Sequence, residues 1–407
     1  MPDPLAGSTT SVEDHRARIL AAVAPLTRFD LVPLADAIGR VLAADVTALL
    51  SVPPFDHAAM DGFAVRAAEV ASAAEESPVD LPVAGVIAAG DQVMPLPAGA
   101  AIRIMTGAPV PPGADVVIPF EWTTGVDPVR ILRTAAAGRH VRNEGEDVAV
   151  GEIALRADTR LGPTQIGLLT SVGVREVPVH PRPRLAVIST GAELVDGQIP
   201  DSNTATLASA GRAVGADVTA FGPVLDDPAA FREQLQKAAE VSDLVVTTGG
   251  VSAGDHDVVK AALRDVDGFW FGPVAMKPGR PQGFGVVPTS DGRHVPVVTL
   301  PGTPVAAYAS FLLYVVPALH VLAGSEPARH TAALAASVEG ADRTVLLPGL
   351  FDHEGRIAPL PGHAGHSQRL LAVADALLVV PATGKVVPEG TTVEVLPLHP
   401  EEDRDGR

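Results

Sequence analysis

Short apolar runs alternate with amphipathic segments through the middle of the chain. The runs are rich in β-branched residues, as buried parallel strands are, and lie at residues 185–189, 217–224, 244–248 and 295–300. Apolar positions at helical spacing recur in the intervening segments, at residues 202–214, 231–240 and 258–265. This alternation predicts an open α/β sheet, which we assign to a domain at residues 177–326.

Other patterns flank this domain. Residues 51–147 hold short Val and Ile runs between Gly, Pro and Asp turns, which predicts an inserted β-rich domain. Helical patterns at residues 11–50 and 148–176 predict one split helical domain, with helices at 13–23, 34–42 and 158–174. Residues 327–400 return to Val and Leu runs, which predicts a C-terminal β-barrel. The predicted fold class is therefore multidomain α/β plus β.

Residues 305–323 are apolar enough to raise the question of a membrane span. The segment contains Ser310, Pro317 and His320 and follows a predicted strand, so a buried helix packed on the sheet is the favoured interpretation. The acidic, polar N-terminus lacks the apolar core of a signal peptide. We therefore expect a soluble cytoplasmic protein without membrane contact.

Composition narrows the chemistry. The 407 residues carry a formal net charge of −18 and no long basic stretch, which argues against nucleic-acid binding. There is no cysteine, which excludes disulfides, thiolate catalysis and thiolate metal sites. Because the protein is acidic, an anionic substrate needs local cations. Most basic residues are arginine, so the lysine at Lys277, in a Pro/Gly loop, is a candidate for that role.

The first candidate site lies at residues 244–257. The apolar run there ends at Gly249 and Gly250 and a helical pattern follows, an arrangement that presents backbone N–H groups to an anion. The same turn carries Ser252, Asp255 and Asp257. Carboxylates repel a phosphate, so an oxygen-liganded cation such as Mg²⁺ is the natural mediator. These residues predict a phosphorylated ligand held through a metal ion.

More acidic residues follow other predicted strands. Glu193 and Asp226 lie at two such ends, and the loops at 277–283 and 301–304 lie at others. Since ligands bind at the carboxyl edge of open α/β sheets, we expect one composite site there. A single acid is explained as a helix cap, but acids after three strands exceed what capping explains. Outside this domain, an Asp-Gly turn is the simpler explanation of Asp61.

Seven motifs occur in order along nearly the whole chain. They lie at residues 54–65 (PFDHAAMDGFAV), 104–111 (IMTGAPVP), 145–147 (GED), 189–194 (STGAEL), 249–255 (GGVSAGD), 277–281 (KPGRP) and 300–304 (LPGTP). Each is weak alone, but the ordered set is specific. With these motifs the sequence resembles the molybdopterin molybdenumtransferases, the family of MoeA and the gephyrin E domain.

The resemblance implies the four domains assigned above, in an elongated homodimer whose active-site cleft both subunits line. The implied reaction takes adenylylated molybdopterin and molybdate and yields molybdenum cofactor and AMP, with Mg²⁺ present. The ligand is thus a small pterin nucleotide, and no nucleic acid takes part. A transient contact with molybdopterin adenylyltransferase, which supplies the substrate, is implied as well.

Site residues are carried over by motif. Catalytic roles fall on Asp61, Thr106, Asp147, Glu193, Asp226, Asp257 and Lys277. Substrate-binding roles fall on Gly249, Gly250, Ser252, Asp255, Arg280, Pro301, Gly302, Pro304 and Ser367. We expect Glu193, Asp226 and Asp257 to hold the metal on the phosphate linkage, and Lys277 to offset charge on molybdate or a phosphate. The residues of the inserted domain are expected to close the cleft across the dimer.

The sequence also departs from the family. Thr303 stands where Asn is usual, Arg280 where Lys is common, and Ala192 where an acid is frequent. Residues 367–369 (SQR) match a serine-rich motif only in part, which leaves a molybdate contact at Ser367 open. The alternatives are a paralogue that inserts tungstate, a scaffold that binds or delivers molybdopterin without turnover, and, third, a nucleotidyltransferase of the related α/β type.

Overall fold

The computed structural model describes residues 9–251, 257–362 and 367–398. The chain divides into two compact units: unit 1, of residues 1–30 and 180–407, and unit 2, of residues 31–179. The predicted site residues Ser252 and Asp255 lie outside the described residues. All other predicted site residues are described.

Unit 1 is built on a six-stranded sheet of order β15-β14-β16-β20-β19-β17. Four strands are parallel: β15 (Asp217–Ala220), β14 (Arg184–Ser189), β16 (Leu244–Thr248) and β20 (His294–Leu300). The sheet continues antiparallel through β19 (Pro281–Pro288) and β17 (Trp270–Pro273). The predicted open α/β sheet is confirmed.

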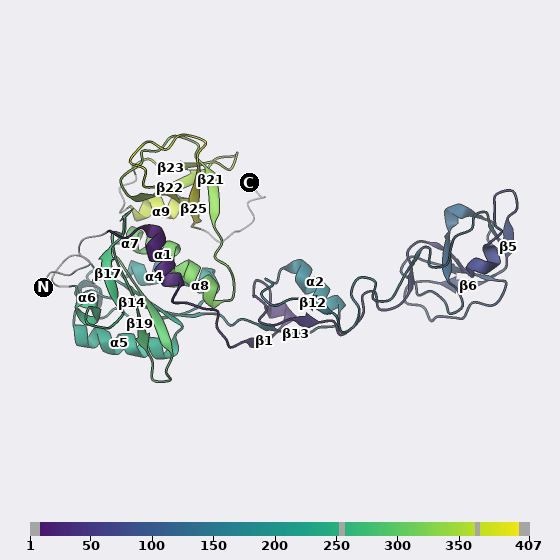
Figure 1. Ribbon diagram of the computed structural model, residues 1–407, viewed down its shortest axis with the longest axis horizontal. Coiled ribbons are helices and arrows are strands. Elements are labelled where there is room, and N and C mark those ends of the chain that lie inside the picture. The colour runs from purple at the N-terminus through teal and green to yellow at the C-terminus, as the bar shows by residue number, and fades with distance from the viewer. Residues whose placement is uncertain (1–8, 252–256, 363–366, 399–407) are drawn as a thin grey trace. The chain divides into compact units, whose positions relative to one another are not determined.

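Helices cover both faces of this sheet. Successive residues of a strand point to opposite sides, so Leu185 and Val187 enter one core while Ala186 and Ile188 enter the other. The first core also receives α1 (Val12–Leu20), α4 (Ser202–Ala213), α7 (Pro304–Ser310) and α8 (Val316–Leu322). The second receives α5 (Pro228–Val241) and α6 (Val258–Leu263) (Figure 1).

The apolar segment expected at residues 305–323 is helical from Pro304 to Leu322, through α7, the π-helical turn η4 (Phe311–Val315) and α8. The helix is long and apolar enough to cross a membrane, but 67% of its most apolar window is buried inside the protein. Phe311 and Tyr314 are fully buried in the first core. The segment is therefore a core helix packed on the sheet, as predicted.

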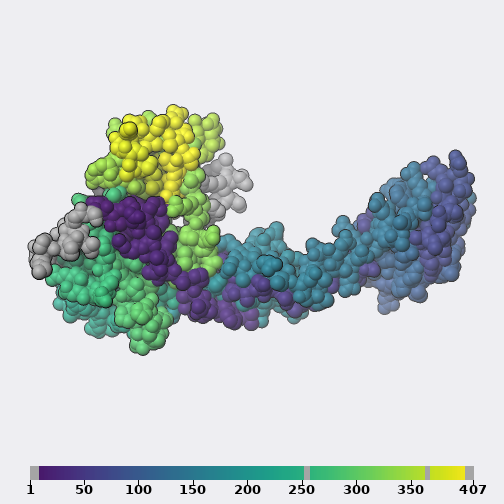
Figure 2. All heavy atoms as spheres, viewed as in Figure 1, coloured from purple at the N-terminus to yellow at the C-terminus, as the bar shows by residue number. Residues whose placement is uncertain are grey.

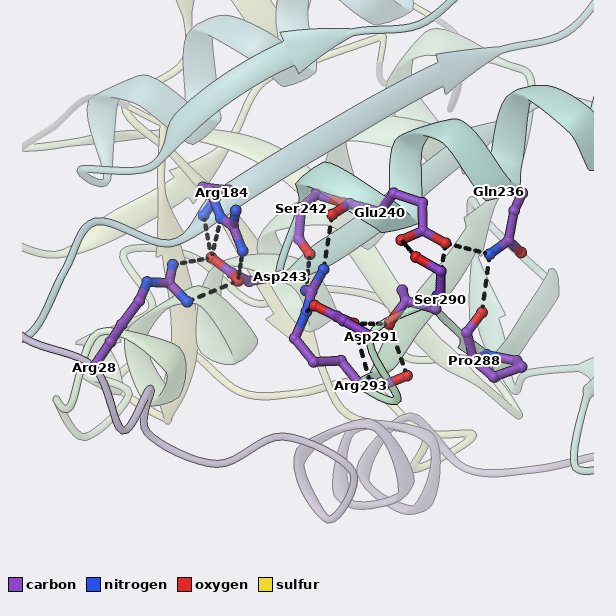
Figure 3. A network of polar contacts seen from close by, with 11 residues as sticks. Arg28, Arg184, Gln236, Glu240, Ser242, Asp243, Pro288, Ser290, Asp291 and Arg293 are labelled. Carbon is purple, nitrogen blue, oxygen red and sulfur yellow. Dashed lines mark hydrogen bonds and ion pairs between the residues drawn. The ribbon is translucent and has the colours of Figure 1, made fainter.

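A buried carboxylate joins the amino ends of β14 and β16 (Figure 3). Asp243 accepts hydrogen bonds from the Arg28 guanidinium at 2.6 and 3.1 Å. It also accepts from the Arg184 guanidinium at 2.8 and 3.2 Å and from the Arg184 backbone N–H at 2.9 Å. Burial raises the pKa of Asp243, but the hydrogen bonds from Arg184 and Arg28 outweigh burial and hold that pKa at about 2. Nearby, Arg293 donates to two backbone carbonyls at the end of α5, at 2.8 Å each.

A second six-stranded sheet completes unit 1, and its strands from residue 330 onward belong to the yellow-green to yellow lobe of Figure 2. Its strands are β18 (Met276–Lys277), β22 (Thr344–Phe351), β24 (Ala376–Val380), β25 (Thr392–Pro397) and β21 (His330–Ala333), with β23 (Ile357–Pro359) paired to β22. Helix α9 (Gln368–Val373) precedes β24. Among the described residues these pairs form an open path and not the closed ring of a barrel.

Unit 2 contains small sheets and one α-helix within its described length, residues 31–179. A four-stranded sheet has the order β6-β7-β4-β8, from Val83–Ile87, Ala101–Ile104, Gly62–Val65 and Val116–Pro119. A three-stranded sheet joins β5 (Val79–Leu81), β10 (Val129–Ile131) and β9 (Thr123–Thr124). Short 3-10 turns lie at Ala67–Val70 and Phe120–Trp122. The described strands of residues 51–147 thus form small sheets.

Three strand pairs and a helix complete unit 2. The pairs are β11 (Val141–Arg142) with β3 (His57–Ala58), β12 (Ile153–Leu155) with β2 (Val46–Thr47), and β1 (Asp30–Pro33) with β13 (Glu176–Val179). The helix expected at 158–174 exists as α2 (Pro163–Ser171), with Pro163 in its first turn and Gly173 just beyond its end. It begins later than predicted, because Asp158 has a φ of +64° and Arg160 pairs with Val41. The pairs β2–β12 and β1–β13 link the two segments on either side of the β-rich insertion.

Two predictions in the N-terminal segment fail. The helix expected at residues 34–42 is wrong: only Leu34–Asp36 forms a 3-10 turn. Beyond it Gly39 has a φ of +76°, and Leu42 bridges the distant Val179, so tertiary pairing overrides the local apolar spacing. The helix expected at 13–23 exists as α1, but it packs in unit 1, which divides the segment 11–50 between the units.

Candidate functional site

A pocket of about 640 Å³ opens at the carboxyl ends of the parallel strands of unit 1. Loops after β14, β16 and β20 form its walls, which is where an open α/β sheet binds ligands. Eight predicted site residues line it: Glu193, Asp226, Gly249, Gly250, Asp257, Pro301, Gly302 and Pro304. The structure therefore brings together the residues that the sequence placed at separate strand ends.

Two of the acids are linked through the start of a short helix. Asp226 accepts a hydrogen bond from the backbone N–H of Ala192 at 3.2 Å. Ala192 begins α3 (Ala192–Val195), whose second residue is Glu193. Asp226 therefore fixes the turn that presents Glu193 to the pocket. The third acid, Asp257, lies at the N-cap of α6 and lines the same pocket.

The glycine turn after β16 allows close packing. Gly249 and Gly250 have φ values of +92° and +64°, a region that favours glycine. A Cβ atom at Gly249 would lie 2.8 Å from Oγ1 of Thr190, closer than real contacts allow. The Gly249 N–H donates to the carbonyl of Leu300 at 3.2 Å, so this N–H is already used. The absence of a side chain at Gly249 therefore allows the β16 turn to pack closely against Thr190.

The pocket is acidic. Four carboxylates line it, Glu193, Asp201, Asp226 and Asp257, and none of its described lining residues is Lys, Arg or His. An anionic ligand therefore meets repulsion unless a cation accompanies it. Among the described residues no group of three His, Asp or Glu side chains is close enough to form a metal cage. The set does fit Mg²⁺, which one or two carboxylates usually hold together with substrate phosphates and waters.

The two predicted basic residues lie outside the lining. Lys277 was expected in a loop of the α/β sheet. It lies instead at the end of β18, a strand that pairs with β22 in the C-terminal sheet. Arg280 is exposed, although its neighbours Gly279 and Pro281 both line the pocket. Lys277 and Arg280 therefore flank the lining residue Gly279 but do not themselves belong to the described lining of the pocket.

The last predicted substrate-binding residue, Ser367, caps α9. Its hydroxyl accepts from the backbone N–H of Leu370 at 3.3 Å, an ordinary N-cap contact. The next residue, Gln368, donates to the hydroxyl of Ser202 at 3.4 Å, and Ser202 lines the pocket. The C-terminal lobe therefore reaches the rim of the pocket through α9, one residue from Ser367.

In unit 2, Asp61 and Thr106 are in contact. Asp61 accepts hydrogen bonds from the backbone N–H of Thr106 at 2.7 Å and from its hydroxyl at 2.6 Å. The Thr106 hydroxyl and then its N–H lower the pKa of Asp61. Asp147 is exposed, and its backbone N–H donates to the carbonyl of Val52 at 3.0 Å. Asp61 thus does more than form an Asp-Gly turn, because its carboxylate organises a second loop.

Sequence reasoning missed the start of α4. Asp201, Ser202 and Asn203 all line the pocket. Asp201 accepts the hydroxyl of Ser189 at 2.5 Å and the backbone N–H of Thr204 at 3.0 Å. The sequence signal was present, but Asp-Ser before a helix is the usual N-cap pattern and carries no mark of a ligand site.

Three family models match the chain in order. They are the MoeA N-terminal region (domain I and II) at residues 10–173, the probable molybdopterin binding domain at 186–321, and the MoeA C-terminal region (domain IV) at 331–398. Together they cover most of the sequence.

Whole-length relatives agree with these models. The chain is 42% identical to molybdopterin molybdenumtransferase 2 of Mycobacterium tuberculosis, over 95% of this chain and 99% of that protein. It is 38% identical to molybdopterin molybdenumtransferase 1 of the same organism, over 95% and 98%. A crystal structure of molybdopterin biosynthesis moeA protein from Pyrococcus horikoshii OT3 matches with a TM-score of 0.80 at 27% identity, over 95% of this chain and 99% of that one.

Proposed function

Because this chain belongs to the MoeA family of molybdopterin molybdenumtransferases, a transferase family of molybdenum cofactor biosynthesis, we propose that it inserts molybdate into adenylylated molybdopterin and releases AMP. The observation that carries the proposal is the pocket in unit 1, where acids and glycine turns from three strand ends meet. Its volume of about 640 Å³ lies in the range of small-molecule sites.

The chain's residues take different parts in this proposal. One or two of the carboxylates of Glu193, Asp226 and Asp257 would hold Mg²⁺ together with the substrate phosphates, and the ion would supply Lewis acidity to the phosphate oxygens. Gly250 and the residues after it, including Ser252 and Asp255, receive the phosphates. Pro301, Gly302 and Pro304 form the adjoining wall of the pocket. An oxygen of water or of molybdate bonds to the phosphorus of the pterin phosphate as its phosphoanhydride bond to AMP breaks, and AMP is the leaving group.

Other predicted residues belong to the periphery of this site. Arg280 and Lys277 add positive charge beside the acidic pocket, and Ser367 stands near its rim. Asp61, Thr106 and Asp147 contribute from unit 2 of a second subunit. This part of the proposal rests on the family's motifs at these positions and on the Asp61–Thr106 contact.

A homodimer belongs to the proposal. Leu31 and Leu49 of unit 2 are 61% and 60% exposed and line one shallow depression together with the charged Asp45, Arg175 and Glu176. A second copy of the chain would cover the two exposed leucines. The molar mass measured by light scattering after size-exclusion chromatography tests this proposal. A mass of twice the chain mass of 41.7 kDa supports the homodimer, and a mass equal to that of one chain contradicts it. Three further points complete the proposal. The protein is cytoplasmic, and its C-terminal sheet closes into a barrel. It contacts a molybdopterin adenylyltransferase transiently to receive its substrate.

Turnover decides between this function and its alternatives. Purified protein is incubated with adenylylated molybdopterin, Mg²⁺ and either molybdate or tungstate, and AMP is measured. We expect AMP release that depends on Mg²⁺ and on the added oxyanion, and that is faster with molybdate than with tungstate. Binding of the substrate without AMP release would support the scaffold alternative instead, and preference for tungstate would indicate the altered paralogue.

A further inference from the structure

Asn203 ties together three segments of the pocket wall. It is the second residue of α4, and its side-chain amide Nδ2 makes two hydrogen bonds of 2.8 Å. One goes to Oγ1 of Thr248, at the end of β16, and the other to the backbone carbonyl of Gly302, in the loop before α7. All three residues line the pocket. One amide group therefore spans the β16 turn and the β20–α7 loop.

The contacts of the partners settle the orientation of the amide. The Gly302 carbonyl can only accept a hydrogen bond. The Thr248 hydroxyl gives its own hydrogen to the carbonyl of Pro301, at 3.1 Å, so toward Asn203 it also accepts. The position needs two N–H donors at one atom, which the amide nitrogen of Asn203 provides. An aspartate of the same shape would direct an oxygen at two acceptors.

The two segments held by Asn203 touch one another. A Cβ atom added at Gly302 would lie 3.3 Å from Cα of Gly249. Gly249 in turn donates its backbone N–H to the carbonyl of Leu300 at 3.2 Å. The spacing of the two glycine loops is therefore fixed by Asn203 on one side and by direct backbone contact on the other. Both loops face the space assigned to the phosphates.

We propose that Asn203 is a positioning residue for the transfer reaction, which sets the spacing of the glycine loops that receive the phosphate groups of the substrate. This inference rests on the proposed function, because the loops are taken to bind phosphate. Asn203 acts through Thr248 and Gly302 and not on the reacting atoms. Since errors near 1 Å in such positioning lower rates by about 100-fold, removing the amide donors should have a large effect on turnover.

The test compares Asn203→Asp and Asn203→Ala with Thr204→Val in the full chain. Thr204 is a matched control, because it is the next residue of α4, does not line the pocket, and has a buried hydroxyl without a hydrogen-bond partner among the described residues. Two measurements are made: calorimetric titration with AMP in the presence of Mg²⁺, and AMP release from adenylylated molybdopterin. Calorimetry gives the number of binding sites and the dissociation constant separately.

A positioning role predicts that both Asn203 variants keep the number of sites per chain and bind AMP about tenfold or more weakly, while turnover falls about 100-fold. Thr204→Val should match the unmodified protein. A purely structural role would lower the number of sites without changing the dissociation constant, and this result, or variants equal to the unmodified protein, overturns the inference. If the unmodified protein binds AMP but releases none from the substrate, the proposed function fails, while the change in AMP affinity still decides the role of Asn203.

Discussion

The two ends of the parallel sheet in unit 1 use acidic residues in opposite ways. At the amino end Asp243 is buried and accepts five hydrogen bonds from Arg28 and Arg184 (Figure 3). At the carboxyl end four carboxylates line a pocket whose described lining has no basic side chain. The first arrangement neutralises charge within the fold, and the second leaves negative charge for a ligand and its cation to neutralise.

Stability and function can therefore be altered separately in this protein. A carboxylate held by arginines contributes to the native state, so its loss lowers stability. Carboxylates gathered without a cation repel one another, so their loss removes repulsion and is neutral or stabilising, as it often is at functional sites.

The largest effect is expected in the pocket. Glu193→Gln and Asp226→Asn keep the size of each side chain but remove a charge, and each should lower AMP release about 100-fold or more. The free energy of unfolding should stay the same or rise. The control is Asp196→Asn, which also removes one negative charge. Asp196 lies just after α3 and outside the pocket lining, so this variant should keep full activity. Full activity in both pocket variants would remove the acids from the proposed mechanism.

At the opposite end, Asp243→Asn should lower the free energy of unfolding by about 3 kcal/mol, because two arginines lose their shared buried partner. Chemical denaturation measures this change. AMP affinity should not change, since Asp243 lies at the amino ends of the strands and the pocket lies at their carboxyl ends. Asp80→Asn, which breaks an exposed pair with Arg130 in unit 2, should leave the denaturation midpoint unchanged. A tenfold loss of AMP affinity in Asp243→Asn would show that the two ends are not independent.

The pH dependence of stability should come from the amino end. The pKa of Asp243 falls from 3.8 to about 2 on folding, so its carboxylate stabilises the native state above pH 3.8 and that stabilisation is lost as the pH falls to about 2. The stability difference between the unmodified protein and Asp243→Asn should therefore be constant above this window and shrink within it. A difference that keeps its full size at pH 2 would contradict the assignment.

The smallest effect is expected at Arg293, which donates to two carbonyls at the end of α5. Arg293→Leu should lower the free energy of unfolding by about 1 kcal/mol, the usual value for lost helix-end hydrogen bonds. Arg293→Lys should recover part of this loss. Neither change should alter turnover, and a change in turnover would link this end of the sheet to the pocket.

The sequence predicted the α/β sheet well because its central strands are buried on both faces. Residues 244–248 form β16 with the predicted bounds, and the acids at the strand ends meet in one pocket. The helix expected at 34–42 failed because Leu42 pairs with Val179, a partner that local spacing does not show. Lys277 was placed in a loop for a related reason, since its strand joins another sheet.

The start of α4 shows a different limit. Asp201 and Asn203 look like the first residues of any helix, and only the folded chain shows that Asn203 reaches Thr248 and Gly302. The partners of Asp243 were also hidden, because Arg28 lies 215 residues away in the sequence. Residue type and local spacing therefore locate the site, while its internal hydrogen bonds depend on tertiary contacts.

The central claim is that the acidic pocket holds its phosphate ligand through a cation. Calorimetric titration of the full chain with AMP, once with Mg²⁺ and once with a chelator, measures this directly. We expect a dissociation constant that is at least about tenfold higher with the chelator, because four carboxylates then face the phosphate unscreened. Equal affinity under the two conditions would contradict it.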